Sequence, residues 1–216
     1  MAEDDELIVL DFWSSPFGAR VRIALREKGL EFESIEQDLV NKSSLLLEMN
    51  PVNKQLPVLI RNGKPICEST IIVQYVDETW TTSTPLLPDD PYQRSRARFW
   101  ADYIDKKIYN VAKALWVDQE GATEQLIECF KTIELELGEK PYLGGDTFGL
   151  ADINLVSFSS MFYTWEKCGN FSLSVECPKL ATWITRCRER DSVAKSLPDP
   201  HKIYEFFMNF KNNASN

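Results

Sequence analysis

The sequence predicts an α/β domain followed by an all-helical domain, and three observations carry this prediction. Between residues 7 and 37, a short apolar run, an amphipathic helical pattern and a second strand-like run follow one another. Asn62-Gly63 then separates two further apolar runs, and a helical pattern comes directly after them. From residue 92 onward, apolar residues recur every three or four positions and no segment is convincing as a strand.

The first domain is expected to begin with a strand, a helix and a parallel strand. "LIVLDF", from Leu7 to Phe12, fits a buried strand. Pro16 suits the first turn of a helix that ends at Gly29, because proline has no backbone N–H to leave unsatisfied there. "LEFESIEQ" alternates as a strand does, and strand–helix–strand units are connected with a right-handed crossover.

A β-hairpin and another helix complete the α/β domain. The segment "PVLIRNGKPICES" carries Asn-Gly between two apolar runs, which is the strongest short-range hairpin signal. The following "STIIVQYVDETW" has helical spacing. The domain is therefore assigned to residues 1–80 in the order βαβ then ββα.

A connecting segment and five helical regions make up the rest. "TTSTPLLPDDP", residues 81–91, is rich in turn-forming residues and is expected to link the domains. Residues 92–216 are assigned to the helical domain. Its predicted helices are Tyr92–Trp116, Thr123–Leu137, Leu150–Trp165, Pro178–Arg190 and "HKIYEFFMNF" near the C-terminus.

Composition excludes several classes of function. The formal net charge is −9, whereas nucleic acids and acidic lipid surfaces require a basic face. No stretch approaches the roughly 18 to 20 apolar residues of a membrane helix. The acidic start "MAEDDE" lacks the pattern of a signal peptide, so a cytoplasmic location is expected.

The cysteines and the single histidine restrict the chemistry further. The five cysteines are widely and irregularly spaced, which favours free thiols over disulfides or a metal site. His201, the one histidine, lies near the C-terminus, and the residues around Ser15 lack the GxSxG pattern. A Ser-His-Asp hydrolase is therefore improbable, and no metal is expected.

Several long strings resemble one family. "DFWSSPFGARVRIALREKG", "NPVNKQLPVLIRNGKPICES" and "DPYQRSRARFWADYIDKKIY" are similar to the plant tau class of the cytosolic glutathione transferases. The similarity continues through "GGDTFGLADI", "ECPKLATWITRC" and "SVAKSLPD", nearly from end to end. It implies a thioredoxin-like first domain that holds glutathione and a helical domain with a pocket for hydrophobic electrophiles. It also implies a homodimer.

Ser15 lies at the predicted strand-to-helix turn and has two interpretations. A serine before a helix is commonly its N-cap. In the family motif the catalytic hydroxyl comes immediately before Pro-Phe, which assigns that role to Ser15 and leaves Ser14 as a turn residue. A free thiol has a pKa of about 8.5, so a hydroxyl donor and a helix N-terminus need to lower it by only about one to two units.

The resemblance assigns most of the glutathione site to the α/β domain. The residue before the cis-proline of the family motif, Leu56 before Pro57, would pair with the cysteinyl backbone of glutathione. Glu68 would meet the γ-glutamyl ammonium group. Ser69 would cap the following helix, whose free amides suit a carboxylate.

The glycyl end of glutathione is assigned to Lys42 and Gln55. The family commonly has a second lysine where this chain has Gln55, so we expect weaker binding of glutathione, because an amide brings no charge. Phe17 would line the junction of the two pockets. Arg20, on the first helix, is expected at the surface.

The electrophile pocket is assigned to aromatic residues of the helical domain. Tyr109, Lys113 and Trp116 recur at i, i+4 and i+7 and share one helix face. By family position they line the pocket with Trp165 and a phenylalanine of the C-terminal helix, Phe207 or Phe206, acting as a lid. The expected activity is conjugation of glutathione to hydrophobic electrophiles, with peroxidase activity through the same thiolate. The alternative is a non-catalytic carrier, or ligandin, of hydrophobic molecules.

Overall fold

The computed structural model describes residues 5–117 and 119–214, with side chains to residue 211. The chain divides into two compact units, Met1–Leu87 and Pro88–Asn216. The division falls within residues 81–91, where the sequence places the connecting segment. In the part of the chain that the structure describes, none of the helices combines the length and apolar character needed to cross a membrane.

The first unit contains a four-stranded sheet in the order β2-β1-β3-β4. Strand β1 pairs with β2 in parallel, and β3 pairs with both β1 and β4 in antiparallel fashion. These pairings confirm the predicted βαβ–ββα order. The elements are β1 Leu7–Asp11, α1 Pro16–Glu27, β2 Glu33–Glu36, α2 Ser44–Met49, β3 Val58–Arg61, β4 Lys64–Cys67 and α3 Ser69–Thr79.

The predicted hairpin turns at Asn62-Gly63. Both residues have positive φ, 49° and 75°, which is the backbone geometry that a two-residue turn of this kind requires. Asparagine and glycine adopt this geometry at low cost. The hairpin therefore follows directly from two adjacent residues.

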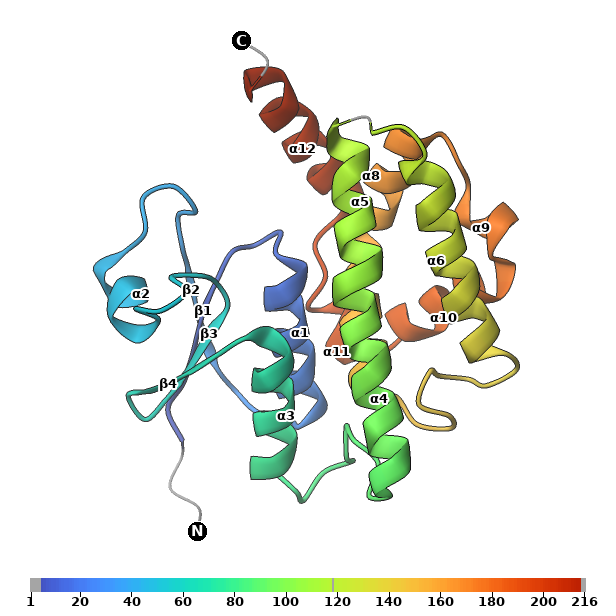
Figure 1. Cartoon of the computed structure of the whole chain (residues 1–216). Coiled ribbons are helices and arrows are strands. Elements are labelled where there is room, and N and C mark those ends of the chain that lie inside the picture. Colours follow the sequence, from blue (N-terminus) through green and yellow to red (C-terminus); the bar gives the residue numbers. More distant parts are fainter. Residues whose placement is uncertain (1–4, 118, 215–216) are drawn as a thin grey trace. The chain divides into compact units, whose positions relative to one another are not determined.

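Helices cover both faces of the sheet. Figure 1 shows α1 and α3 side by side on one face and α2 on the other. On the α2 side, Leu46 packs with Leu10, Val58 and Ile60 in one buried cluster. We did not predict α2, although Ser43 caps it by accepting a hydrogen bond from the Leu46 N–H at 3.1 Å.

The strand register brings several connecting segments to one end of the sheet. Asp11 at the end of β1 lies beside Glu36 at the end of β2. Leu10 pairs with Val58 at the start of β3, and Val58 pairs with Cys67 at the end of β4. The segments after β1, β2 and β4 and the segment before β3 therefore meet at this end.

The second unit is built from helices, as predicted. Its longest helices are α4 Pro91–Tyr103, α6 Ala122–Leu137, α8 Ser159–Gly169, α10 Pro178–Arg188 and α12 Pro200–Ala214. The shorter ones are η1 Ile104–Tyr109, α5 Asn110–Ala114, η2 Leu115–Val117, α7 Leu150–Val156, α9 Leu173–Glu176 and α11 Asp191–Ala194.

Two predicted helices are interrupted. The helix predicted over Tyr92–Trp116 contains the π-helical segment η1 between α4 and α5. The helix predicted over Leu150–Trp165 breaks between α7 and α8, where the Ser157 hydroxyl donates to the Asn154 carbonyl at 3.0 Å. A serine bound to its own helix backbone competes with the regular hydrogen bonds, which explains the break.

Candidate active site

Ser15 lies at the end of the sheet where the connecting segments meet. Its N–H donates to the Phe12 carbonyl at 2.8 Å, which closes the turn between β1 and α1. Its Oγ accepts a hydrogen bond from the Gly18 N–H at 3.1 Å, so Ser15 is the N-cap of α1. This bond uses an oxygen lone pair, and the hydroxyl hydrogen is still able to donate. Capping and donation to a bound sulfur are therefore compatible.

A buried ion pair packs against the first turn of α1. Asp11 pairs with Arg22, and Asp11 is almost completely buried. Burial lowers the pKa of Arg22 to about 10, which leaves the guanidinium charged at neutral pH. The Asp11 carboxylate lies against the Cα of Gly18 and leaves no space for a Cβ there.

Arg20 is buried, so the expectation of a surface position is wrong. Its guanidinium donates to the Ser69 hydroxyl at 3.2 Å and to the Thr70 hydroxyl at 3.4 Å. It also lies 4.9 Å from the centre of the Phe17 ring. Arg20 thus connects α1 to the first turn of α3. Its side chain is buried because it lies on the side of α1 that faces α3.

Glu68, not Ser69, is the N-cap of α3, which corrects the prediction. Glu68 has a φ of 70°, and no side-chain cap is formed. Ser69 is the first helical residue, and its hydroxyl accepts the bond from Arg20. The Glu68 carboxylate is exposed and accepts a hydrogen bond from the Asn53 amide at 2.7 Å.

The loop before β3 connects the remaining predicted residues. The Asn50 side chain donates to the Gln55 carbonyl at 3.0 Å, and Lys42 donates to the Lys54 carbonyl at 2.8 Å. The Leu56–Pro57 peptide bond is cis, as the resemblance implied. The loop therefore meets Lys42 on one side and, through Asn53, Glu68 on the other.

Asn53 was missed by the sequence analysis. Its partner Glu68 is 15 positions away along the chain, and "NPVNKQLP" gave no indication of this contact. Burial and the charge of Glu68 raise the pKa of the neighbouring Cys67 thiol, which disfavours its thiolate form.

The arrangement suits an extended anionic peptide. It combines the Ser15 hydroxyl at the N-terminus of α1, the N-terminus of α3, an exposed carboxylate and an exposed ammonium group. Helix N-termini and cations favour carboxylates and thiolates. Among the described residues, no group of three or more His, Cys, Asp or Glu side chains is placed to hold a metal ion.

In the helical unit, three of the predicted pocket residues lie on consecutive helical segments: Tyr109 on η1, Lys113 on α5 and Trp116 on η2. The Lys113 ammonium lies 4.8 Å from the centre of the Tyr109 ring. The Tyr109 ring stacks on Phe158 at 5.4 Å. The Trp116 ring contacts the Phe207 ring of α12 at 4.7 Å.

Trp165 belongs to the core and not to a pocket, which corrects its assignment. Its side chain is 0% exposed, so it does not line an open pocket. Its ring packs against Phe158, Phe162 and Phe130 at 5.1 to 6.3 Å. The reason is helical periodicity: an aromatic residue on the inner face of α8 meets the neighbouring helices.

A thioredoxin-like sheet whose binding end suits a peptide thiol, followed by a helical unit, defines the glutathione transferase fold. Residues 5–78 match the family model of the glutathione S-transferase N-terminal domain, and residues 117–191 match that of the C-terminal domain. The chain belongs to the glutathione S-transferase family and, within it, to the tau class. The predicted fold class is confirmed.

Individual relatives support this placement. The probable glutathione S-transferase parA of Nicotiana tabacum is 55% identical over 213 residues, 97% of each chain. Glutathione S-transferase U25 of Arabidopsis thaliana is 57% identical over 206 residues, 94% of this chain and 93% of the relative.

Solved structures of similar proteins have the same fold. Rice GST1 (OsGSTU1) in complex with glutathione has a TM-score of 0.94 and 46% identity, covering 98% of this chain and 99% of the other. The Tau class MiGSTU from mango has a TM-score of 0.89 and 39% identity, covering 93% and 96%.

Proposed function

We propose that this chain transfers glutathione to hydrophobic electrophiles and that Ser15 stabilises the thiolate. The observation that carries the proposal is the convergence at one end of the sheet. There the Ser15 turn, the loop around Leu56 and the Glu68-Ser69 pair follow from a single strand register. Rice GST1, which covers nearly the whole chain, is described in complex with glutathione.

Glutathione would lie along this end of the sheet. Glu68, oriented by Asn53, receives the γ-glutamyl ammonium group. The adjacent carboxylate meets the free amides of α3 at Ser69, with the buried Arg20 behind them. Leu56 pairs with the cysteinyl backbone.

The glycyl carboxylate and the cysteinyl thiol of glutathione have separate sets of contacts. The glycyl carboxylate meets Lys42 and Gln55. Phe17 and Pro57 complete the walls around the cysteinyl group. Ser15 donates its hydroxyl hydrogen to the sulfur while its oxygen continues to cap α1.

The chemistry is carried by the substrate's own sulfur. The thiol proton leaves to solvent, since the anion is favoured by the hydroxyl donor and the positive end of α1. The thiolate then attacks the electrophilic carbon and forms a C–S bond. With 1-chloro-2,4-dinitrobenzene as substrate, chloride leaves with the electron pair of the C–Cl bond.

The electrophile would be held by the aromatic face of the helical unit. Tyr109, Lys113, Trp116 and Phe207 are the proposed contacts, because Trp116 packs on Phe207 and the Lys113 ammonium lies over the Tyr109 ring. We further propose a homodimer with a cytoplasmic location. Size-exclusion chromatography with light scattering tests the oligomeric state.

The experiment is steady-state conjugation of 1-chloro-2,4-dinitrobenzene by the parent, Ser15→Ala and Ser15→Thr. We expect Ser15→Ala to lower kcat/KM roughly ten- to hundredfold at neutral pH, because the thiol pKa rises by about one to two units. The pH profile of kcat/KM should shift upward by the same amount. Ser15→Thr should retain most of the activity, since threonine keeps both the hydroxyl and the cap.

A second variant separates chemistry from helix capping. Asp90 caps α4 by accepting the Gln93 N–H at 2.9 Å, so Asp90→Ala removes a cap outside the proposed site. This variant should lose stability without a shift of the pH profile. Equal rates for the parent and Ser15→Ala would remove Ser15 from the mechanism. Glutathione binding without turnover in the parent would favour a carrier.

A further inference from the structure

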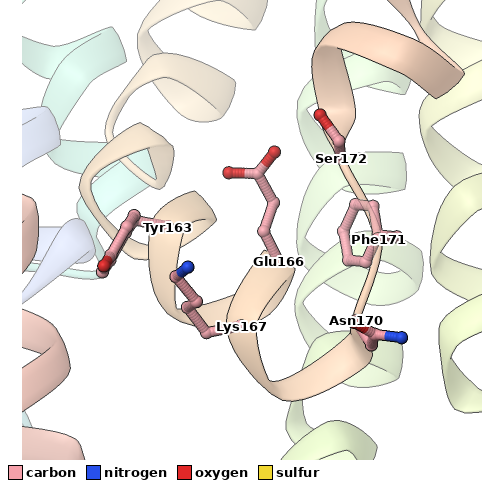
Figure 2. Close-up of a pocket in the computed structure, with 6 residues that line it drawn as sticks. All are labelled: Tyr163, Glu166, Lys167, Asn170, Phe171 and Ser172. Atoms are coloured by element: carbon pink, nitrogen blue, oxygen red, sulfur yellow. The ribbon is translucent and has the colours of Figure 1, made fainter.

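A cavity of about 280 Å³ opens within the helical unit, apart from every residue assigned to glutathione or to the electrophile. It lies between the C-terminal turns of α8 and the segment leading into α9. Figure 2 shows the lining side chains, with Glu166 between Tyr163 and Lys167 on one side and Phe171 and Ser172 on the other. The lining residues are Tyr163, Glu166, Lys167, Asn170, Phe171 and Ser172.

Glu166 holds the wall of this cavity in place. Its backbone carbonyl accepts hydrogen bonds from the N–H groups of Asn170 and, at 3.2 Å, Phe171. Its Oε1 accepts the Leu173 N–H at 2.7 Å. The backbone carbonyl of Glu166 therefore holds the turn after α8, and its half-buried side chain holds the start of α9. The cavity is preformed, which reduces the entropic cost of binding a ligand.

Two opposite charges border the cavity without pairing with each other. Within residues 5–117 and 119–211, Oε2 of Glu166 has no hydrogen bond or ion pair. Over the same residues, the Lys167 ammonium contacts only the Tyr163 ring, 5.3 Å from its centre. Successive residues of a helix point in different directions, which keeps the two charges apart. An anion and a cation thus each lack a charged partner.

The remaining lining combines two aromatic rings, Tyr163 and Phe171, with two polar side chains, Asn170 and Ser172. The Phe171 ring packs on Phe130 at 6.5 Å, and the Tyr163 ring contacts His201 at 4.5 Å and Tyr204 at 5.6 Å. These contacts fix the rings as apolar surfaces beside the two charges. The volume lies near the lower limit of small-molecule pockets, about 300 Å³. The ligand must therefore be small, zwitterionic and partly apolar.

We propose that this cavity binds a free α-amino acid with an aromatic or large apolar side chain. Its ammonium group pairs with Glu166, its carboxylate pairs with Lys167, and its side chain contacts Phe171. An anion alone would face the Glu166 carboxylate, and a cation alone would face the Lys167 ammonium. A zwitterion satisfies both. The proposal does not depend on the glutathione transferase reaction.

The test is calorimetric titration of the full-length protein with L-phenylalanine, in saturating glutathione to fill the glutathione site. We expect a dissociation constant of about 1 mM or tighter. The analogues 3-phenylpropionate, which lacks the ammonium group, and 2-phenylethylamine, which lacks the carboxylate, should bind at least about tenfold more weakly. The tenfold ratio corresponds to about 1.4 kcal/mol for one lost charge pair.

Two variants assign the binding to this cavity. Glu166→Gln removes the charge and retains an oxygen for the Leu173 N–H, so the wall is preserved. Lys167→Gln removes the exposed ammonium group. Each variant should weaken the binding of L-phenylalanine at least about tenfold and leave the rate of glutathione conjugation unchanged. Glu189→Gln and Lys107→Gln, exposed charges elsewhere in the helical unit, should bind like the parent.

Three results would overturn the proposal. These are no heat with L-phenylalanine in the parent, equal affinity for the amino acid and its two analogues, and unchanged affinity in both Glu166→Gln and Lys167→Gln. Failure here leaves the transferase proposal untouched, because conjugation is measured separately with Ser15→Ala. Loss of conjugation in Ser15→Ala equally leaves the amino-acid titration unaffected.

Discussion

Gln55 shows how one side chain sets the charge of the proposed glutathione site. Its backbone is fixed by Asn50, and its exposed side chain extends from a loop that Lys42 also contacts through the Lys54 carbonyl. In the proposed site, the Lys42 ammonium would be shared between that carbonyl and the glycyl carboxylate of glutathione. An amide at position 55 adds a hydrogen-bond donor and no charge. The proposed site would therefore hold the glycyl end of glutathione with less positive charge than two lysines would supply.

Gln55→Lys should strengthen glutathione binding. We expect the KM for glutathione to fall roughly two- to fivefold with little change in kcat, because an exposed ion pair contributes up to about 1 kcal/mol. The gain should shrink in 0.5 M salt, since screening weakens exposed charges. Gln125→Lys, at an exposed position of the helical unit, is the matched control. An unchanged KM would remove Gln55 from the glycyl contact.

At the scale of the element, the N-terminus of α7 depends on one buried carboxylate. Asp152 accepts hydrogen bonds from the N–H groups of Gly149 at 3.1 Å and Leu143 at 2.8 Å and from the Trp183 indole at 2.9 Å. Desolvation nevertheless raises the pKa of Asp152 to about 6, against the lowering effect of these bonds. The helix end is therefore sensitive to protonation in a mildly acidic range.

The pH dependence of stability should carry the signature of Asp152. A carboxyl group whose pKa is raised on folding stabilises the protein below its unfolded pKa, 3.8, and this contribution is lost as the pH rises through about 6. The contribution is on the order of 2 to 3 kcal/mol. Urea denaturation of the parent and Asp152→Asn between pH 4.5 and 7 measures it.

Asp152→Asn should be less stable than the parent over this whole pH range. Its side-chain NH2 group faces the Gly149 N–H and does not accept a hydrogen bond from it. Its free energy of unfolding should also lack the decline that Asp152 causes in this range. Asp146→Asn changes an exposed acid of the same segment, and its free energy of unfolding should decline with pH as in the parent. Parallel pH curves for the parent and Asp152→Asn would contradict the assigned titration.

At the scale of the whole molecule, a buried ion pair attaches the connecting segment to the first unit. The Lys28 side chain is 0% exposed and pairs with Asp77 at 2.7 Å, joining the end of α1 to α3. Lys28 also donates to the Thr84 carbonyl at 3.1 Å, and the Asp77 carboxylate accepts the N–H groups of Leu86 and Leu87. The path of the chain out of the first unit is thus determined by two charges.

Lys28→Met should release this segment. Removing one partner of a buried pair leaves the other charge uncompensated, at a cost of about 3 to 5 kcal/mol. We expect lower thermal stability and faster amide hydrogen exchange over residues 81–91, measured by mass spectrometry. Lys64→Met, an exposed lysine of β4, should exchange like the parent. Unchanged exchange in Lys28→Met would show that the ion pair does not hold the segment.

Local patterns were sufficient for the elements and insufficient for the contacts between them. The hairpin at Asn62-Gly63 and the cap at Ser15 each depend on residues within three positions; the hairpin was predicted, and the cap was one of the two interpretations of Ser15. Arg20 was assigned to the surface because its partner Ser69 is 49 positions away. The Asn53–Glu68 bond was missed for the same reason.

The sequence by itself determined the order of the strands and of the longer helices, and the family to which the chain belongs. These follow from periodicity, turn chemistry and residue types, which act over a few positions. Only the tertiary structure decided that Arg20 lies behind Ser69, that Trp165 is core and that Glu166 and Lys167 border a cavity. Burial and pairing depend on which elements pack together, and the strand register and the helix contacts settle that over the whole unit.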